Sequence, residues 1–514
     1  MTHRGVLFGS LLLALACCHG KSSAEFPVII VGGGWAGLGA AVELEKAGTP
    51  YILLEARDRL GGRSWTSTPV GEDMPLDMGS SWIHGTVDNP IMKFASEFDL
   101  PTTTGDWDIW STSYAYWTNG SQMSESAKEK AGNMWDTFNS QTEEVSRGNA
   151  SMSYKEAATI VFEKYGYDPT EQTLMIWLSS ILIGDCGGND ISWVVPGANG
   201  CDVRGTQVIL PNGYAELIDM VSQKYINQSS IRLNVPVTGL YQDEEDPSVV
   251  NVQTSTPLVF KASKVILTVP IGVLQHEFID FVPRLLAPVR NAILHIGSGP
   301  VEKVIVRFNG TLPLPSDRPF VFYIPLEEGE FPAIVNFANI SSNKDQVMVF
   351  FCAGNCALIA DREGKDGLVQ HVMQILNTII PNFPPPVAAA VTRWNNDEFS
   401  RGSYSYVPIH GENREREAFL APFGNILFAG EHVNGARYAY TDGAYMSGVS
   451  AARAVPMMGE GDGRATDGPA ITAMRILVHR SYVVDCANAR GKRSRFQKKS
   501  RNERNAGIET IRKM

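Results

Sequence analysis

The fold is decided by one stretch of sequence, Phe26-Pro27-Val28-Ile29-Ile30-Val31-Gly32-Gly33-Gly34-Trp35-Ala36-Gly37. Its apolar first half predicts a strand over residues 26–31, and the glycines after it predict a tight turn. The next residues place Ala41, Leu44 and Ala47 at helical spacing, and a second apolar run, residues 51–54, ends in Glu55. This order of strand, turn, helix and strand begins a doubly wound parallel sheet, so we expect an α/β fold.

The glycines of this turn have the spacing of a dinucleotide-binding loop. Gly32 permits the tight turn, Gly34 lets the backbone approach a pyrophosphate, and Gly37 lets the helix pack closely on the strand. The N-terminus of the helix offers free N–H groups to the phosphates. Glu55 lies 18 residues beyond Gly37, where a carboxylate can accept hydrogen bonds from ribose hydroxyls. The pattern predicts a bound dinucleotide but does not separate NAD from FAD.

A second glycine-rich loop follows without a break, Glu55-Ala56-Arg57-Asp58-Arg59-Leu60-Gly61-Gly62-Arg63. Its two glycines can turn the backbone sharply, and its guanidinium groups can face a diphosphate. The alternative is an ordinary solvated turn. A second phosphate-facing loop favours FAD over NAD.

Near the C-terminus stand Phe428-Ala429-Gly430-Glu431-His432 and Ala439-Tyr440-Thr441-Asp442-Gly443-Ala444-Tyr445-Met446-Ser447-Gly448. A Gly-Glu turn after a strand over residues 426–429 places a carboxylate beside a ribityl hydroxyl. The helix that we expect over residues 442–455 can direct its positive N-terminus at the electron-rich edge of a flavin ring.

Together with Leu76-Asp77-Met78-Gly79-Ser80-Ser81-Trp82-Ile83-His84-Gly85, these motifs resemble the flavin amine oxidase family, and within it the polyamine oxidases. The resemblance covers residues 26 to 455. It implies an FAD-binding Rossmann-like (two-dinucleotide-binding) domain with an inserted α+β substrate-binding domain of mixed sheet and helices. The FAD-binding domain is expected over residues 26–90, 203–272 and 392–456, and the substrate-binding domain over residues 91–202 and 273–391.

The resemblance also implies a set of residues that bind FAD: Gly32, Gly34, Trp35, Ala36, Gly37, Glu55, Ala56, Arg57, Gly62, Arg63, Gly79, Ser80, Ser81, Trp82, Val237, Trp394, Gly430, Glu431, Tyr440 and Thr441. Glu55 and Arg63 would hold the adenosine and diphosphate end, Glu431 the ribityl chain and Thr441 the pyrimidine edge. No cysteine stands at residues 440–441, where monoamine oxidases attach their flavin, so we expect non-covalent FAD.

Four residues are expected to carry the chemistry. Lys303 lies in a strand of alternating apolar residues; alone, such a lysine is typical of a solvent-facing position, but in the family it holds a water against the flavin. Tyr404 and Tyr440 match two aromatics that flank the substrate amine and can stabilise its positive charge. His84 matches a residue of the polyamine channel and can accept an ammonium hydrogen bond, although a lone histidine is commonly structural.

The expected reaction is therefore oxidation of a secondary amine of spermine, spermidine or their acetylated forms by O2, giving an aldehyde, an amine and hydrogen peroxide. A secreted L-amino-acid oxidase of the same fold is the first alternative; Arg401 and Arg437 are its candidates for binding a carboxylate. A non-catalytic flavin-binding protein or a chromatin-type amine oxidase is the second, and an isomerase or desaturase of the same superfamily the third. The residues leave open which polyamine is used and which side of its nitrogen is cleaved.

The rest of the sequence bears on location and partners. Residues 1–24 read as a secretory signal peptide, with a signal anchor as the alternative, and sequons at Asn119, Asn149, Asn227, Asn309 and Asn339 agree with export. Of seven cysteines, Cys186/Cys201 and Cys352/Cys356 have spacings compatible with disulfides, and none joins a metal-ligand pattern. The net charge of −11 favours cationic ligands over nucleic acid. We expect a monomer without membrane insertion, and a basic tail over residues 457–514 that is disordered or has a separate sorting role.

Overall fold

The computed structural model describes residues 25–105, 113–149, 151–182, 191–194, 196, 203–315, 318–324, 331, 333–337, 340 and 346–455. The predicted signal peptide, the basic tail, Cys186, Cys201 and Asn339 lie outside the described residues. Within the described part, no helix is both long and apolar enough to cross a membrane.

The first sheet is built around β1 (Phe26–Val31), which lies between β2 (Tyr51–Leu54) and β12 (Val259–Leu267) in parallel register. β21 (Ile426–Phe428) pairs with β12, and β9 (Ile231–Arg232) extends the sheet beyond β2. All residues of β2 and the last four of β1 are buried. Such continuous apolar strands are stable only when helices cover both faces of the sheet.

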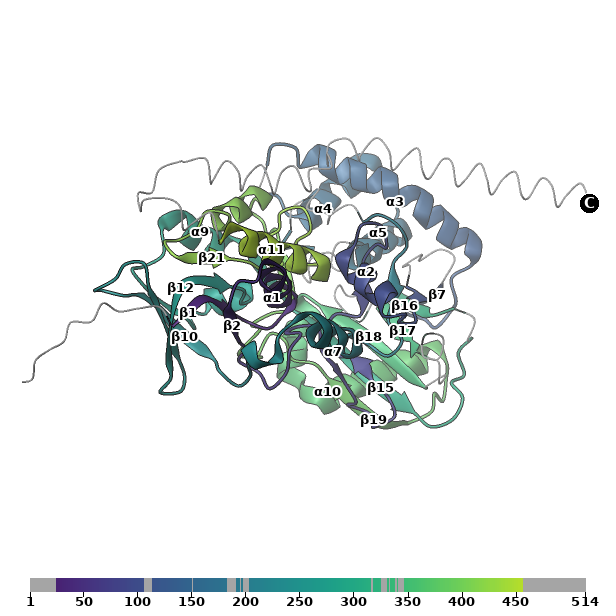
Figure 1. The fold of residues 1–514 in the computed structure, drawn as a ribbon. Helices are drawn as coiled ribbons and strands as arrows, with labels where there is room; N and C mark the ends of the chain where they lie inside the picture. The colour runs from purple at the N-terminus through teal and green to yellow at the C-terminus, as the bar shows by residue number, and fades with distance from the viewer. Residues whose placement is uncertain are drawn as a thin grey trace, which may run out of the picture.

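Both faces are covered. One layer consists of α1 (Trp35–Ala47), α2 (Pro90–Glu97), α7 (Tyr214–Tyr225) and α11 (Thr441–Ala454), which pack on Val28 and Ile30 of β1. Figure 1 shows α11 beside α1 although the two are far apart in sequence. On the other face, Ile29 and Val31 pack with α8 (Ile271–Gln275), α9 (Ala287–His295) and η3 (Asn413–Phe419). The alternation follows from the two-residue period of a strand.

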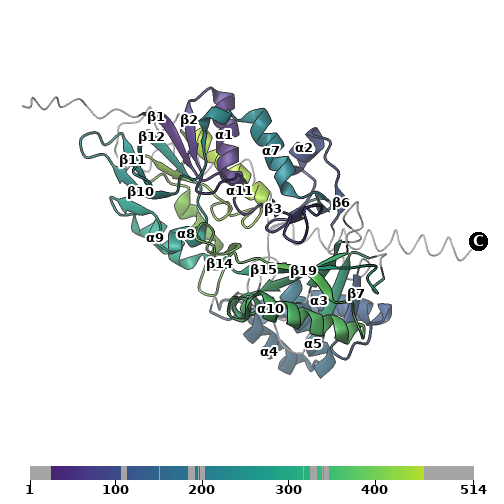
Figure 2. The same ribbon diagram turned by 90° about the horizontal axis from the view of Figure 1, so that it is seen from below.

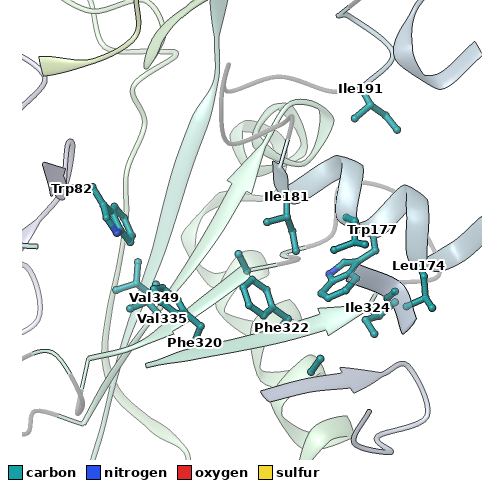
Figure 3. Packing of buried hydrophobic residues seen from close by; sticks show 14 of the residues in the cluster. Trp82, Leu174, Trp177, Ile181, Ile191, Phe320, Phe322, Ile324, Val335 and Val349 are labelled. Atoms are coloured by element: carbon teal, nitrogen blue, oxygen red, sulfur yellow. The ribbon is translucent and has the colours of Figure 1, made fainter. Parts of the chain in front are cut away.

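The second sheet is antiparallel except at one edge and has the order β19 (Pro386–Val391), β15 (Val301–Phe308), β18 (Val347–Ala353), β17 (Ala333–Asn336), β16 (Phe320–Ile324) and β7 (Ser113–Trp117). Helix α10 (Asn355–Ile379) covers one face. Helices α3 (Glu125–Val145), α4 (Tyr154–Tyr165) and α5 (Pro169–Leu182) cover the other. Figure 2 shows this sheet and the first one at opposite ends of the molecule. In Figure 3, Trp177 and Ile181 of α5 lie beside Phe322 of β16, and Phe320 of the same strand lies close to Val335 and Val349.

The other short elements are β3 (Thr66–Ser67), β4 (Leu76–Asp77), β5 (Trp82–Ile83), β6 (Thr103–Thr104), β8 (Val208–Ile209), β14 (Gly297–Gly299), β20 (Tyr404–Tyr406) and η1 (Gln228–Ser230). The first sheet is completed by β10 (Val237–Gln242), β11 (Val250–Thr254) and β13 (Asp280–Val282).

The structure confirms the predicted fold class and corrects one boundary. The predicted start of the second domain segment, residue 273, falls inside α8, and β13 pairs with β10 of the first sheet. Because α9 also packs in the core of the first sheet, residues 273–296 belong with that sheet and not with the substrate-binding part. Strands β9 and β10 are separated by a bend in which Asn234 has a φ of 58°. Cys352 and Cys356 form a disulfide.

Candidate functional site

A cavity of about 840 Å³ runs between the two sheets, within the size range of cofactor and ligand sites. Twenty-three different residues are expected to bind FAD or carry the chemistry, and every one lines this cavity except Gly37. Gly37 lies behind the wall, where a Cβ would sit 1.9 Å from the carbonyl oxygen of Gly32. Its place therefore fits the role of letting α1 approach β1, while the others surround one continuous space.

Glu55 fixes the glycine-rich turn at one end of the cavity. Its carboxylate accepts hydrogen bonds from the backbone N–H of Gly33 (2.6 Å) and of Arg57 (2.8 Å). Burial raises the pKa of Glu55, and the two N–H groups and the Arg57 charge partly offset this. Two backbone donors leave carboxylate lone pairs for further hydroxyl donors, as a ribose would supply.

Two helix N-termini point into the cavity, and at neither does the N-cap residue supply a side-chain cap, although the Asp442 carboxylate in the first turn of α11 accepts backbone N–H groups. Helix α1 starts after Gly34 and helix α11 after Tyr440; neither residue makes a capping hydrogen bond, and both first turns line the cavity. A Cβ on Gly34 would meet no protein atom closer than the Cα of Gly62 at 4.0 Å, so the space beside Gly34 belongs to the cavity. Uncapped helix N-termini attract negative charge. The site thus fits FAD, with the diphosphate at α1 and the electron-rich edge of the flavin at α11.

Arginines tie the loop after Glu55 to the C-terminal segment. Arg57 donates to both carboxylate oxygens of Asp397, and Arg63 donates to Glu431 Oε1 (3.0 Å) and to the carbonyl of Ser403 (2.9 Å). Burial alone would raise the pKa of Glu431, but Arg63 and its other partners lower that pKa to about 2. Glu431 is therefore an anion, and it holds Arg63 at the cavity wall.

Lys303 is buried, so the solvent-facing interpretation of the sequence is wrong. It lies on β15, which is paired on both sides, and 6% of the residue is exposed. Its Nζ donates to the carbonyl oxygens of Asp77 (2.7 Å) and Gly79 (2.6 Å) and to Ser81 Oγ (2.7 Å). Burial lowers the pKa of Lys303 to about 8 despite the nearby Asp77 carboxylate. Burial also raises the pKa of Asp77 to about 6, although Lys303 opposes this.

Aromatic groups surround the same end of the cavity. The centres of the Tyr440 and His84 rings are 4.7 Å apart, and the Arg437 guanidinium lies 4.8 Å from the centre of the Tyr440 ring. Tyr404 lines the cavity from β20. Trp394 donates from Nε1 to the carbonyl of Met78 (2.9 Å) and is 6% exposed, so it combines a structural and a lining position.

The sequence did not point to several lining residues. Phe351 pairs with Lys303 across β15 and β18, and Gln207 bonds His84. Asp136 and Asn139 reach the cavity from α3. None of these stands in a recognisable motif, and α3 is sequence-distant from the cofactor loops. Only the cross-strand pairing opposite Lys303 could have identified one of them.

A dinucleotide cavity that reaches a buried lysine between two sheets defines an FAD-dependent oxidoreductase. Residues 35–456 match the family model described as flavin containing amine oxidoreductase. The chain belongs to this family and is an FAD-dependent amine oxidase.

Comparison with individual proteins agrees with this assignment. Polyamine oxidase 3 of Oryza sativa subsp. japonica is 28% identical over 442 residues, covering 82% of this chain and 88% of that protein. Probable polyamine oxidase 4 of Arabidopsis thaliana is 29% identical over 451 residues, covering 84% and 87%. A solved structure of putrescine oxidase, redesigned in its cofactor binding, superimposes with a TM-score of 0.66 at 19% identity and covers 84% of this chain and 98% of its own. The last comparison supports the fold.

Proposed function

We propose that the protein oxidises a secondary amine of a polyamine (spermine, spermidine or an acetylated form) with O2 and water, giving an aldehyde, an amine and hydrogen peroxide. One observation carries the proposal. The described lining includes His84, Asp136 and Asn139, whose side chains can accept hydrogen bonds from a cationic substrate. The positively charged residues of the described lining are Arg57 and Arg63, which belong to the cofactor loop, and Lys303. Such a lining favours a cationic chain over a substrate with a carboxylate. The similar polyamine oxidases support this proposal.

The residues of the chain divide the work. The Tyr404 and Tyr440 rings flank the substrate amine, attract its charged form, and orient the carbon next to the nitrogen once the amine has lost its proton. FAD, when bound, would supply the two-electron acceptor for the oxidation of that carbon, with O2 as the final oxidant. The resulting carbon–nitrogen double bond adds water and breaks to aldehyde and amine. Lys303, held by three acceptors, keeps a proton donor beside the reacting end of the cavity.

The structure does not favour the amino-acid oxidase alternative. Arg437 donates to Asp442 from Nε (2.8 Å) and to the carbonyl of His84 (2.9 Å), and its guanidinium is stacked against Tyr440. Arg401 lies over the ring of Phe278 and is not among the residues that line the cavity. Neither arginine is placed to bind a substrate carboxylate.

Peroxide release from purified yellow protein tests the proposal. We expect turnover of spermine, spermidine or N-acetylated polyamines and none of leucine. Turnover of leucine without any polyamine would overturn it. Activity should rise with pH between 5 and 9 because the reacting amine must lose its proton, and the aldehyde product identifies which side of the nitrogen is cleaved.

We also propose that the protein is secreted, glycosylated and monomeric, with non-covalent FAD. The described sequon residues Asn119, Asn149, Asn227 and Asn309 are all exposed, and the disulfide between Cys352 and Cys356 is typical of an oxidising compartment. When the protein is expressed in eukaryotic cells, it should be found in the culture medium, and its mass should fall on treatment with a glycosidase. Acid precipitation should leave the flavin in the supernatant; flavin in the pellet would refute the non-covalent attachment.

A further inference from the structure

The short strands β5 and β8 bring His84 and Gln207 together. Ile83 pairs with Val208 in antiparallel register, so the residues just beyond them, His84 and Gln207, lie side by side at the end of the pair. His84 Nδ1 and Gln207 Oε1 are 2.6 Å apart. The backbone carbonyl of Gln207 accepts the N–H of Gly105 (2.9 Å). The backbone of Gln207 is therefore fixed independently of His84.

The backbone of His84 is also fixed. Its carbonyl accepts from Arg437 Nη2 (2.9 Å) and from Asn89 Nδ2 (3.2 Å), and its ring packs against Tyr440. His84 has little freedom to turn away from Gln207.

The proton on the imidazole follows from this contact. An amide oxygen carries no proton, so the hydrogen in the bond to Oε1 of Gln207 must lie on Nδ1 of His84. A neutral imidazole has one ring N–H, so Nε2 is left with a lone pair. Nε2 makes no hydrogen bond within the part of the chain that the structure describes, and His84 lines the cavity. Burial, together with the Arg437 charge, lowers the pKa of His84 to about 4, so the ring is neutral near pH 7.

We propose that Gln207 is a positioning residue, which fixes the tautomer of His84 so that Nε2 accepts an ammonium N–H of the bound substrate. The inference rests on the proposed polyamine substrate. A Gln side chain suits the role because it bonds Nδ1 without adding charge. A carboxylate at this position would stabilise the doubly protonated ring, in which Nε2 is a donor and the positive charge repels the substrate. The other charged groups near His84 are Arg437 and its partner Asp442, which form an ion pair with each other.

Three variants test the role of Gln207. Gln207→Glu adds the carboxylate, Gln207→Leu removes the hydrogen bond, and Gln223→Glu adds the same charge at an exposed position of α7 as the matched control. The first readout is the ¹⁵N chemical shift of the His84 ring nitrogens in the FAD-loaded protein, assigned by loss of the signal in His84→Gln. We expect Nδ1–H in the wild type and both nitrogens protonated at pH 7 in Gln207→Glu. A wild-type signal with the proton on Nε2 would overturn the proposal, since it would mean that the amide has the opposite orientation.

The second readout separates substrate binding from turnover. For the polyamine that the wild type uses best, we expect KM to rise at least about tenfold in Gln207→Glu at pH 7.5, because a hydrogen bond to a charged group contributes a factor of this order or more. The value of kcat should stay within about threefold, and FAD content and the Gln223→Glu control should be unchanged. In Gln207→Leu, KM should rise less. An unchanged KM in Gln207→Glu, with normal wild-type turnover of polyamines, refutes this inference; absence of wild-type polyamine turnover refutes the proposed function instead.

Discussion

Replacing Gly37 by alanine tests how the structure makes its diphosphate site. The added Cβ would lie 1.9 Å from the carbonyl oxygen of Gly32, about 1.5 Å short of the 3.4 Å at which ordinary contact begins. The Cβ is fixed to the backbone of α1 and the oxygen belongs to the backbone that follows β1, so the helix N-terminus must move by about that distance. Overpacking of this kind costs roughly 1–3 kcal/mol of stability. It would also break about two hydrogen bonds to a charged group, at roughly 1.5–3 kcal/mol each, and so weaken FAD by roughly 10²- to 10⁴-fold.

Gly34→Ala is the matched control, because its Cβ would meet only the Cα of Gly62 at 4.0 Å and would lie in the cavity itself. The assay is titration of flavin-free protein with FAD, followed by flavin fluorescence, together with thermal unfolding of the flavin-free protein. We expect Gly34→Ala to keep the unfolding temperature and lose FAD affinity, and Gly37→Ala to lose both. FAD affinity within about threefold of wild type in Gly37→Ala would refute the close approach of α1 to the turn.

Lys303→Met should keep FAD bound but lower turnover by about 10²-fold or more, the usual contribution of a positioned proton donor. Lys303→Arg is the control, because it keeps the positive charge. Loss of FAD from Lys303→Met would mean that the lysine has a structural role. His432→Leu should flatten the acid side of the stability profile. Within the residues that the structure describes, neither ring nitrogen of His432 has a hydrogen-bond partner. Burial, with Arg63 and Arg416, lowers the pKa of His432 to about 3, although Glu431 opposes this. The pKa of His432 is lower in the folded state than in the unfolded state, where it is about 6.5. The histidine therefore does not change the free energy of unfolding above about pH 6.5, and it lowers that free energy as the pH falls further, by about 2 kcal/mol at pH 5. Urea unfolding measures the free energy of unfolding at pH 8 and at pH 5, and the difference between the two should be about 2 kcal/mol smaller in His432→Leu than in the wild type. An identical pH dependence in both proteins would contradict the burial of a neutral ring.

Local patterns were sufficient for the parts of the fold that rest on local physics. Residues 26–31 and 51–54 form strands with the predicted bounds, because each is a continuous apolar run. The boundary near residue 272 could not be found in this way. The three residues of β13 carry no strong strand signal, and they belong to the first sheet only because β10 offers them a parallel edge.

The candidate site shows the same division. Gly34, Glu55 and Gly430 stand in motifs whose spacing reflects their contact with a dinucleotide, and all line the cavity. Gln207 and Asp136 carry no such spacing, since the first reaches His84 through a pair of two-residue strands and the second through a helix of the other domain. The burial of Lys303 depended on knowing that both neighbours of β15 exist. Contacts made by tertiary packing left no periodic trace in the sequence.

The position of β1 in the first sheet has a consequence for biosynthesis. β1 begins at Phe26, but its neighbour β12 begins at Val259, and α11, which packs on α1, begins at Thr441. At roughly 5–20 residues per second, about 20–80 seconds separate synthesis of β1 from that of α11. During this interval one edge of β1 and one apolar face of α1 lack the partners that cover them in the folded protein. The cavity cannot be complete before α11 has been synthesised, so flavin incorporation requires the chain at least through Ala444.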